Sequence, residues 1–277
     1  MAGDLHTHTT FSDGSFQPEE LVAAAKKIGL NYLGITDHDT IDGVRRLYEN
    51  GLLPDRNITI IPGVELSVNN PAHDVHLVGY NVDIYNAALI EMLEKIQEAR
   101  WERFSQIVKI LQAKKYDIRE GDILKIADTS RSIGRAHIAR TLVKIGAFKT
   151  VREAFEKMLD KDRPAYVPRY LPELDEVIDV IHQAGGKVVL AHPKLVDNDE
   201  LVEELCGKID GLEVYYPCHK PEDVQHYYFL ARKHGLLISG GSDFHGTASR
   251  FVKALGEFTI SEELAKKFSS SLNLRFD

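Results

Sequence analysis

Residues 32–39 read Tyr-Leu-Gly-Ile-Thr-Asp-His-Asp, an apolar run that ends in three side chains able to bind a metal ion. The length of this run and its apolar residues are typical of a buried strand. Several other short apolar runs of the chain lead to His, Asp or Glu in the same way. Seven runs are predicted as strands, and they lie at Leu5 and at residues 32–36, 58–64, 75–78, 187–191, 211–215 and 236–239.

Helical patterns, with apolar residues three and four positions apart, alternate with most of these strands. They cover residues 18–28, 174–181, 201–205 and 224–233. This alternation indicates an α/β fold with a largely parallel sheet that is covered on both faces. Seven strands suggest an open or distorted β/α barrel, in which active sites gather at the carboxyl ends of the strands. The candidate metal-binding residues follow those ends.

One long stretch, residues 86–163, breaks the alternation because it contains only helical patterns. These patterns lie at residues 87–115, 123–124, 138–145 and 151–159. We therefore predict a catalytic barrel formed by residues 1–85 and 164–277, with an all-helical insertion at 86–163 that covers the substrate.

The charge of the chain is unevenly distributed between these two parts. Its formal net charge of −8 argues against phosphate substrates, nucleic acid and anionic membranes. The insertion, however, holds 17 Lys and Arg against 12 Asp and Glu, a balance of +5. The remainder holds 17 basic and 30 acidic residues, a balance of −13. The basic insertion is compatible with a phosphorylated substrate.

The two cysteines, Cys206 and Cys218, form no CxxC motif, and a disulfide framework is not expected at this size. No apolar run has the roughly 18 residues of a membrane span, and the N-terminus lacks the pattern of a signal peptide. We expect a cytoplasmic protein without membrane association and without an obligate protein partner.

Nitrogen and oxygen donors dominate the predicted site. His6 and His8 lie two residues apart, so on a strand they point to the same face, and Asp243 and His245 repeat this spacing. A single His beside a strand is more often a buried core residue, so the joint pattern carries the inference. No cysteine accompanies the set, which favours Zn²⁺, Mn²⁺ or Fe²⁺. The further candidate ligands are Asp13, His38, Glu65, His76 and His192.

Six motifs, in order along nearly the whole chain, resemble the PHP (polymerase and histidinol phosphatase) family. They are HTHTTFSDG at 6–14, GITDHDT at 34–40, GVELS at 63–67, HLVGY at 76–80, AHP at 191–193 and SGGSDFHG at 239–246. The chain is similar to the stand-alone bacterial phosphoesterases of that family that carry a helical insertion. The resemblance implies a distorted (β/α)7 barrel that holds two to three divalent metal ions.

The resemblance also implies which residues bind each ion. One set is His6, His8, Glu65 and Asp243; a second is Glu65, His76 and His192; a third is Asp13, His38 and His245. His73, close to His76, is expected to be solvated, and Glu213 and Tyr215 are expected to support the ligands. The candidate catalytic residues among the ligands are Glu65, His192, Asp243 and His245.

The chemistry of such a site suits phosphate esters despite the acidic barrel. Three divalent ions outweigh the three carboxylates of the set, so the occupied site is positive. A hydroxide that bridges the metals would attack phosphorus in line, and the ions would neutralise the attacking and leaving oxygens. No covalent nucleophile is needed.

Two stretches of the insertion region, 132–140 and 161–168, resemble the family motifs GRxHIAR and PAYVP. Arg135 and His137 are the candidates for binding a second phosphate, and Tyr166 is a candidate for stacking on a base. Lys194 stands near the position where the family often has an arginine, so it is a further candidate for phosphate binding.

The predicted function is metal-dependent phosphoesterase activity on nucleoside 3′,5′-bisphosphates, on the 5′ ends of short RNA, or on both. The alternatives are a small-molecule monoesterase of the histidinol-phosphatase type and a non-catalytic metal-binding module. A haloacid-dehalogenase-type mechanism with Asp37 as nucleophile is disfavoured, because Ile41 stands where that motif has Thr.

Overall fold

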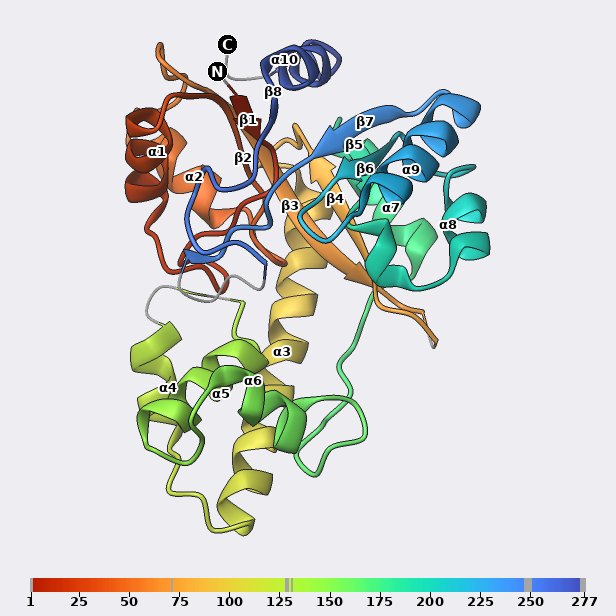
Figure 1. The fold of residues 1–277 in the computed structure, drawn as a ribbon. Coiled ribbons are helices and arrows are strands. Elements are labelled where there is room, and N and C mark those ends of the chain that lie inside the picture. Colours follow the sequence, from red (N-terminus) through yellow and green to blue (C-terminus); the bar gives the residue numbers. More distant parts are fainter. Residues whose placement is uncertain (1, 71, 128–129, 131, 247–250, 275–277) are drawn as a thin grey trace.

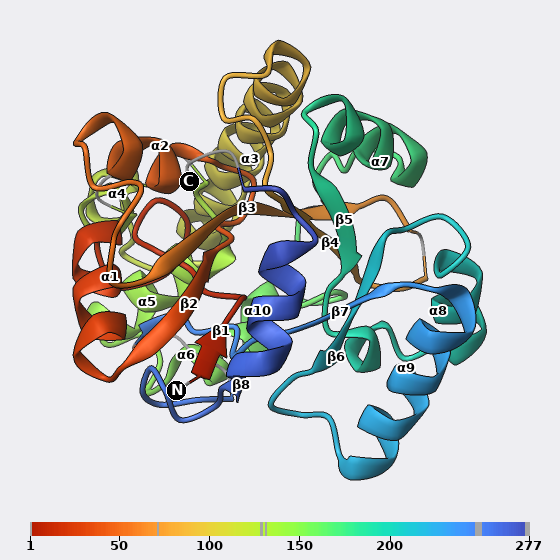
Figure 2. The same cartoon turned by 90° about the horizontal axis from the view of Figure 1, so that it is seen from above.

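The computed structural model describes residues 2–70, 72–127, 130, 132–246 and 251–274. One mixed sheet of eight strands forms a nearly closed barrel, in the order β7-β6-β5-β4-β3-β2-β1-β8 (Figures 1 and 2). The strands are β1 (Ala2–Asp4), β2 (Leu30–Ile35), β3 (Thr59–Val68), β4 (Val75–Tyr80), β5 (Lys187–Leu190), β6 (Gly211–Tyr215), β7 (Leu237–Gly240) and β8 (Ile260–Ser261). The predicted α/β barrel class is confirmed, and the two-residue β8 adds an eighth strand that sequence patterns are too weak to reveal.

Strand β4 departs from the expected parallel arrangement, since it runs antiparallel to both β3 and β5. Only residues 69–74 separate β3 from β4. A parallel crossover needs a dozen or more residues, so this short connection can only form a hairpin. The pairs β1–β2, β2–β3, β5–β6 and β6–β7 are parallel.

The segments that follow β1 and β7 draw the two ends of the sheet together. The amide of Leu5 donates to the carbonyl of Gly240 (3.3 Å), and the amide of Asp243 donates to the carbonyl of His6 (2.9 Å). Gly241 permits this approach, because a Cβ at that position would lie 2.4 Å from His6 Cβ. Two ligand-bearing segments that are more than 200 residues apart in sequence are therefore neighbours in space.

Helices cover the outside of the barrel and one of its ends. The outer helices are α1 (Pro18–Lys27), α2 (Asp42–Glu49), α7 (Leu174–Gln183), α8 (Asp199–Leu205) and α9 (Pro221–His234). Helix α10 (Glu262–Ser270) lies across one end of the barrel (Figure 2). Its Ala265 and Phe268 share an apolar cluster with Leu5, Ile61 and Val78 of the barrel interior. This end is filled by apolar side chains, which leaves the opposite rim for polar residues.

The helical segment 86–163, which the sequence predicts as an insertion, extends from that opposite side (Figure 1). It contains α3 (Ala87–Ala113), α4 (Glu120–Ala127), α5 (Arg135–Lys144), α6 (Val151–Ala154) and the π-helical turn η1 (Phe155–Leu159), so the expected helix at 151–159 changes type part-way. The first half of α3 packs in the barrel core, whereas its second half, from Phe104, packs with α5 in a separate apolar cluster. Within the described residues, no helix combines the length and the apolar character that crossing a membrane requires.

Candidate metal centre

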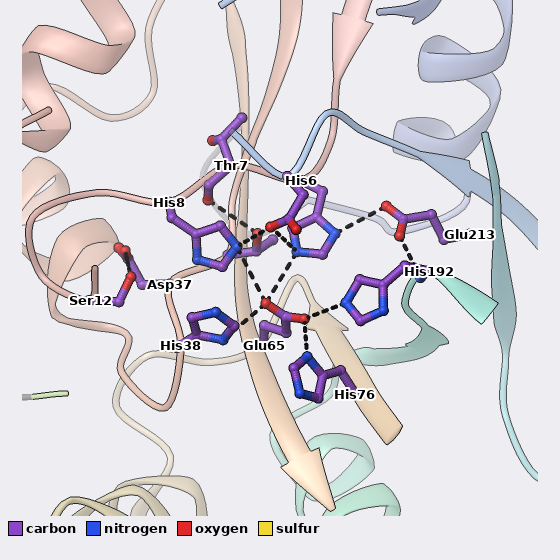
Figure 3. Close-up of polar contacts among 12 residues, drawn as sticks. His6, Thr7, His8, Ser12, Asp37, His38, Glu65, His76, His192 and Glu213 are labelled. Atoms are coloured by element: carbon purple, nitrogen blue, oxygen red, sulfur yellow. Dashed lines mark hydrogen bonds and ion pairs between the residues drawn. The ribbon is translucent and has the colours of Figure 1, made fainter. Parts of the chain in front are cut away.

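The carboxylate of Glu65 lies at the centre of the polar rim. Glu65 is on β3, its side chain is 1% exposed, and its two oxygens face different imidazoles (Figure 3). Oε1 lies 2.8 Å from Nδ1 of His76 and 3.0 Å from Nε2 of His192. A carboxylate whose oxygens face different sets of nitrogens has the arrangement required to bridge two cations.

The second oxygen of Glu65 faces the ligands that follow β1 and β2. Its Oε2 lies 3.2 Å from Nε2 of His6, 3.3 Å from Nε2 of His8 and 3.0 Å from Nδ1 of His38. A parallel bridge between His38 and Glu65 fixes the backbone on that side. The parallel strands end at one rim, and this brings the three histidines together.

The segment after β7 completes the rim. Oδ1 of Asp243 lies 3.1 Å from Nε2 of His8, and Nε2 of His245 lies 3.1 Å from Oδ1 of Asp13. Nε2 of His38 lies 3.9 Å from the same Asp13 oxygen. The nine predicted ligands thus all lie at one end of the barrel.

Three groups of side chains place their donor atoms within 4.8 Å of one another. One contains the four residues of the first predicted set. Another contains the third predicted set together with His8. The last corresponds to the second predicted set, with His38 in place of His192. The groups are His6, His8, Glu65 and Asp243; His8, Asp13, His38 and His245; and His38, Glu65 and His76.

These residues fit divalent cations by two further criteria. Several of their buried nitrogen and oxygen atoms have no hydrogen-bond partner among the described residues, although a side chain of the opposite charge lies close. Two ligands that are each about 2.1 Å from one ion are about 3.0–3.4 Å apart, which is the spacing found around Glu65. The atoms without partners are His6 Nε2, His8 Nδ1 and Nε2, Asp13 Oδ1, Glu65 Oε2, His192 Nδ1 and Asp243 Oδ1.

Burial and mutual charge set the protonation of the cluster. Burial opposes ionisation of Glu65, but His38, His6 and His76 outweigh it and hold its pKa well below the usual range. Burial also lowers the pKa of His76, yet the carboxylates of Glu65 and Asp74 prevail and raise that pKa to about 10. Burial lowers the pKa of His38 to about 3, and the attraction of Glu65 does not offset it. The carboxylate of Glu65 therefore stays ionised and available to cations.

Backbone strain is concentrated at the same rim. Asp39, His192 and Asp243 have φ values of 53°, 31° and 53°, in the left-handed region that non-glycine residues rarely adopt. Such strain costs on the order of 1–3 kcal/mol per residue and persists where surrounding contacts enforce it. Asp39 directly follows the candidate ligand His38, and His192 and Asp243 are candidate ligands themselves. The strained backbone therefore lies where the donor atoms are oriented.

Comparison with known proteins gives the site its family context. The profile of the PHP domain matches residues 4–203. The chain belongs to the PHP domain family. It is 36% identical over 248 residues to the 5′-3′ exoribonuclease Rnm of Salmonella typhimurium, covering 87% of this chain and 84% of that protein.

Two further relatives support the assignment to the PHP family. The 3′,5′-nucleoside bisphosphate phosphatase of Chromobacterium violaceum is 35% identical over 87% of this chain and 86% of its own length. A Bifidobacterium adolescentis structure described as a metal-dependent phosphoesterase superposes with a TM-score of 0.86 at 31% identity, covering 97% of this chain and 95% of that one. This PHP chain is accordingly a metal-dependent phosphoesterase, as its sequence predicts.

Residues behind the candidate ligands hold their side chains in place. Glu213 of β6 binds Nδ1 of His6 through Oε1 (3.0 Å), and its Oε2 accepts the amide of His192 (2.7 Å). The hydroxyl of Tyr216, rather than that of the expected Tyr215, donates to Oδ2 of Asp243 (2.8 Å). The supporting role expected for Glu213 agrees with these contacts.

Asp37 and His73 have structural surroundings. Oδ1 of Asp37 accepts from the amide of Thr9 (2.7 Å) and the hydroxyl of Ser12 (2.6 Å), and Oδ2 accepts from the hydroxyl of Thr9 (2.7 Å). This buried carboxylate organises the loop after β1 and is not presented as a nucleophile. His73 was expected to be solvated, but it is half-buried and bonded through Nδ1 to the carbonyl of Val196 (2.9 Å).

The four predicted substrate-binding residues lie outside the ligand groups. Nδ1 of His137 accepts the amide of Gly134 (3.1 Å), and the ring is buried. Nζ of Lys194 lies 3.0 Å from Oδ1 of Asp223. The guanidinium of Arg135 lies over the ring of Tyr166, 5.8 Å from its centroid. Arg135 and Tyr166 are therefore the two of the four that contact each other.

Three arginines near the PHP site were not predicted. Arg100 pairs with Oδ2 of Asp39 (2.5 Å from Nε), and Arg169 lies 3.4 Å from the same oxygen. Nε of Arg103 donates to the carbonyl of Val167 (2.6 Å). Burial, followed by Arg135, Arg169 and Arg100, lowers the pKa of Arg103 to about 9. Arg100 and Arg103 stand on the apolar stripe of α3, and charged residues on a buried helix face are the sequence signal that could have revealed them.

Proposed function

We propose that this PHP phosphoesterase acts on nucleotides that carry more than one phosphate: nucleoside 3′,5′-bisphosphates, and the 5′ ends of short RNA. The observation that carries the proposal is the excess of guanidinium groups beside the metal centre. Burial lowers the pKa of both Arg103 and Arg169, and the charges of Arg100 and Arg135 lower it further. Asp39 pairs with Arg100 and Arg169. A dianionic phosphate would relieve this excess of positive charge.

A cavity beside the candidate ligands supports the phosphoesterase part of the proposal. A cavity of about 270 Å³ is lined by His38, Glu65, His76, His192 and Asp243, together with Asp74, Leu195 and Tyr216. A phosphate in this cavity reaches the ligands of the proposed centre directly. The relatives described as a bisphosphate phosphatase and an exoribonuclease act on substrates of the proposed kind.

The residues have separable roles in the proposed reaction. Two to three bound divalent ions (Mn²⁺, Zn²⁺ or Fe²⁺) would supply Lewis acidity and lower the pKa of a water. Glu65, His192, Asp243 and His245 hold the centre that faces the scissile phosphate, with the other predicted ligands around them. The insertion at 86–163 covers the substrate, Arg135 and Arg103 bind the second phosphate, and Tyr166 stacks on the base. His137 supports the start of α5, and Lys194 adds positive charge at the outer edge.

The proposal is tested by phosphate release from 3′,5′-bisphosphoadenosine, from 5′-phosphorylated oligoribonucleotides and from 3′-AMP and 5′-AMP, with Mn²⁺ present. We expect kcat/KM to be higher for the bisphosphate than for either monophosphate. Arg103→Ala should lower the bisphosphate value about 10-fold or more and leave the monophosphates nearly unchanged, because one charged hydrogen bond is lost. Arg152→Ala is the matched control, since that side chain is 87% exposed on the insertion surface.

A metal-loaded enzyme that prefers small monoesters would overturn the substrate assignment in favour of the histidinol-phosphatase type. Fewer than two tightly bound divalent ions per chain, with no phosphate released from any of these substrates, would instead argue against the catalytic centre proposed above.

A further inference from the structure

We propose that the helical insertion also assembles part of the metal centre: Arg140 of α5, with Gln97 and Arg100 of α3, positions the group formed by His8, Asp13, His38 and His245. This inference rests on the proposed metal centre, and it adds to the insertion a role that substrate binding does not require. The four residues belong to the barrel sequence, yet the segments that bear two of them are held by contacts from the insertion.

The first contact reaches the loop after β1. Arg140 on α5 donates through Nη2 to the main-chain carbonyl of Asp13. The side chain of Asp13 is the carboxylate of this group, with Oδ1 3.1 Å from His245 and 3.9 Å from His38. A hydrogen bond to the carbonyl of a ligand residue fixes the backbone from which that ligand projects. The buried His137, on the same helix, adds to the contact because its ring interacts with the backbone of Ser12.

The second contact reaches the segment after β2. Nε2 of Gln97 donates to the carbonyl of Asp39 (2.8 Å), and Arg100 pairs with the Asp39 carboxylate. Asp39 directly follows His38, and its φ of 53° requires support from its surroundings. Its amide donates to the carbonyl of Glu65 (3.0 Å), so helix α3 holds one side of this residue and the barrel holds the other.

Within the part of the chain described, other candidate ligands are oriented by residues of the barrel and not by the insertion. Glu213 makes the contacts that orient His6 and His192, and Tyr216 makes the contact that orients Asp243. Both supporting residues lie in or directly after β6 of the barrel. The described residues therefore divide the centre into a part organised by the barrel and a part organised jointly with the insertion.

The inference predicts a selective loss of one ion. Metal-free protein is titrated with Mn²⁺ alone, and free and bound ions are counted in wild type, Arg140→Ala, Arg140→Lys, Gln97→Ala and Lys144→Ala. We expect three sites in wild type, with one affinity lowered about 10- to 100-fold in both Arg140→Ala and Gln97→Ala and the other two unchanged. Arg140→Lys retains a charged donor and should restore part of the affinity. Lys144, exposed one turn further along α5, is the control.

The outcomes separate this inference from the proposed function. Unchanged affinity at all three sites in Arg140→Ala and Gln97→Ala, or an equal loss at all three, would overturn the inference and leave the metal centre standing. Two bound ions in wild type would also overturn the inference alone. Fewer than two would overturn both the inference and the proposed metal centre. Thermal unfolding of the metal-free variants shows whether they fold, and Gln97→Ala provides the test if Arg140→Ala does not.

Discussion

Nδ1 of His76 lies 2.8 Å from Oε1 of Glu65, across the hairpin formed by β3 and β4. In this antiparallel pair His76 is in register with Ser67, two residues beyond Glu65 on the same face of β3. The reversal of β4 places the start of that strand at the rim where the parallel strands end. A ligand at the beginning of a strand thus joins ligands that follow the ends of the others.

Replacing Glu65 by Gln removes the charge that faces five imidazoles. An amide cannot bridge two cations, so Glu65→Gln should bind fewer Mn²⁺ ions and lose about 100-fold or more in kcat/KM. Metal analysis and phosphate release measure the two effects. Glu222→Gln, at an exposed position of α9, should leave both unchanged. Full activity of Glu65→Gln would contradict the central place given to this carboxylate.

Glu213 is expected to affect metal binding indirectly, by orienting His6 and His192. Glu213→Gln weakens the contact to Nδ1 of His6 and disturbs the contact to the amide of His192, so metal affinity should fall about 10- to 100-fold. The expected signature is activity that recovers when excess Mn²⁺ is added. A loss that added metal does not reduce would indicate a role other than orientation of the ligands.

Gly241 tests the closure of the barrel. A Cβ at this position would lie 2.4 Å from the main-chain nitrogen of His6, so Gly241→Ala should destabilise the fold by about 3 kcal/mol. Among the described residues, a Cβ added to Gly121 of α4 would meet no atom within 4 Å, so the same substitution there should stabilise the fold slightly. Chemical denaturation of both variants, metal-free, measures the contrast. Equal effects would contradict the close approach of the two segments.

Metal removal should lower thermal stability. Ions that bind the folded chain alone stabilise it by about 2.7 kcal/mol when their concentration is 100 times the dissociation constant. Dialysis against EDTA should therefore lower Tm, and Mn²⁺ should restore it, while Glu65→Gln should show a smaller shift. An identical Tm with and without chelator would argue against tight binding at the folded site.

The sequence predicted those parts of the fold and site that depend on local pattern. The positions of polar residues after apolar runs placed most of the candidate ligands at one rim. The strand expected to carry His6 and His8 ends before them, at Asp4, and His76 reaches the rim only because β4 is reversed. The family resemblance is confirmed by the match over residues 4–203. The short helix α2 and the helix α10 were not predicted, because α2 has few apolar positions and α10 lies beyond the last recognised strand.

Contacts between segments that are far apart in the sequence could not be predicted from local pattern. The strained backbone of Asp39, the pairing of Arg100 with it, and the contact from Arg140 to Asp13 depend on segments far apart in the chain. The grouping of His8 with Asp13 and of His38 with His76 likewise depends on the curvature of the rim. Residue type and spacing identify donors, but packing decides which donors meet.

The continuity of helix α3 limits how this enzyme can be recombined with its relatives. The helix contributes Leu89, Leu93 and Ile96 to one core and Phe104 and Ile107 to the other without interruption. A chimaera cut at the loop before residue 87 would exchange part of the apolar core that the barrel shares with its outer helices, together with the insertion. The workable junction is inside the helix, between Ile96 and Phe104, where a graft preserves both cores and must match only the helical register.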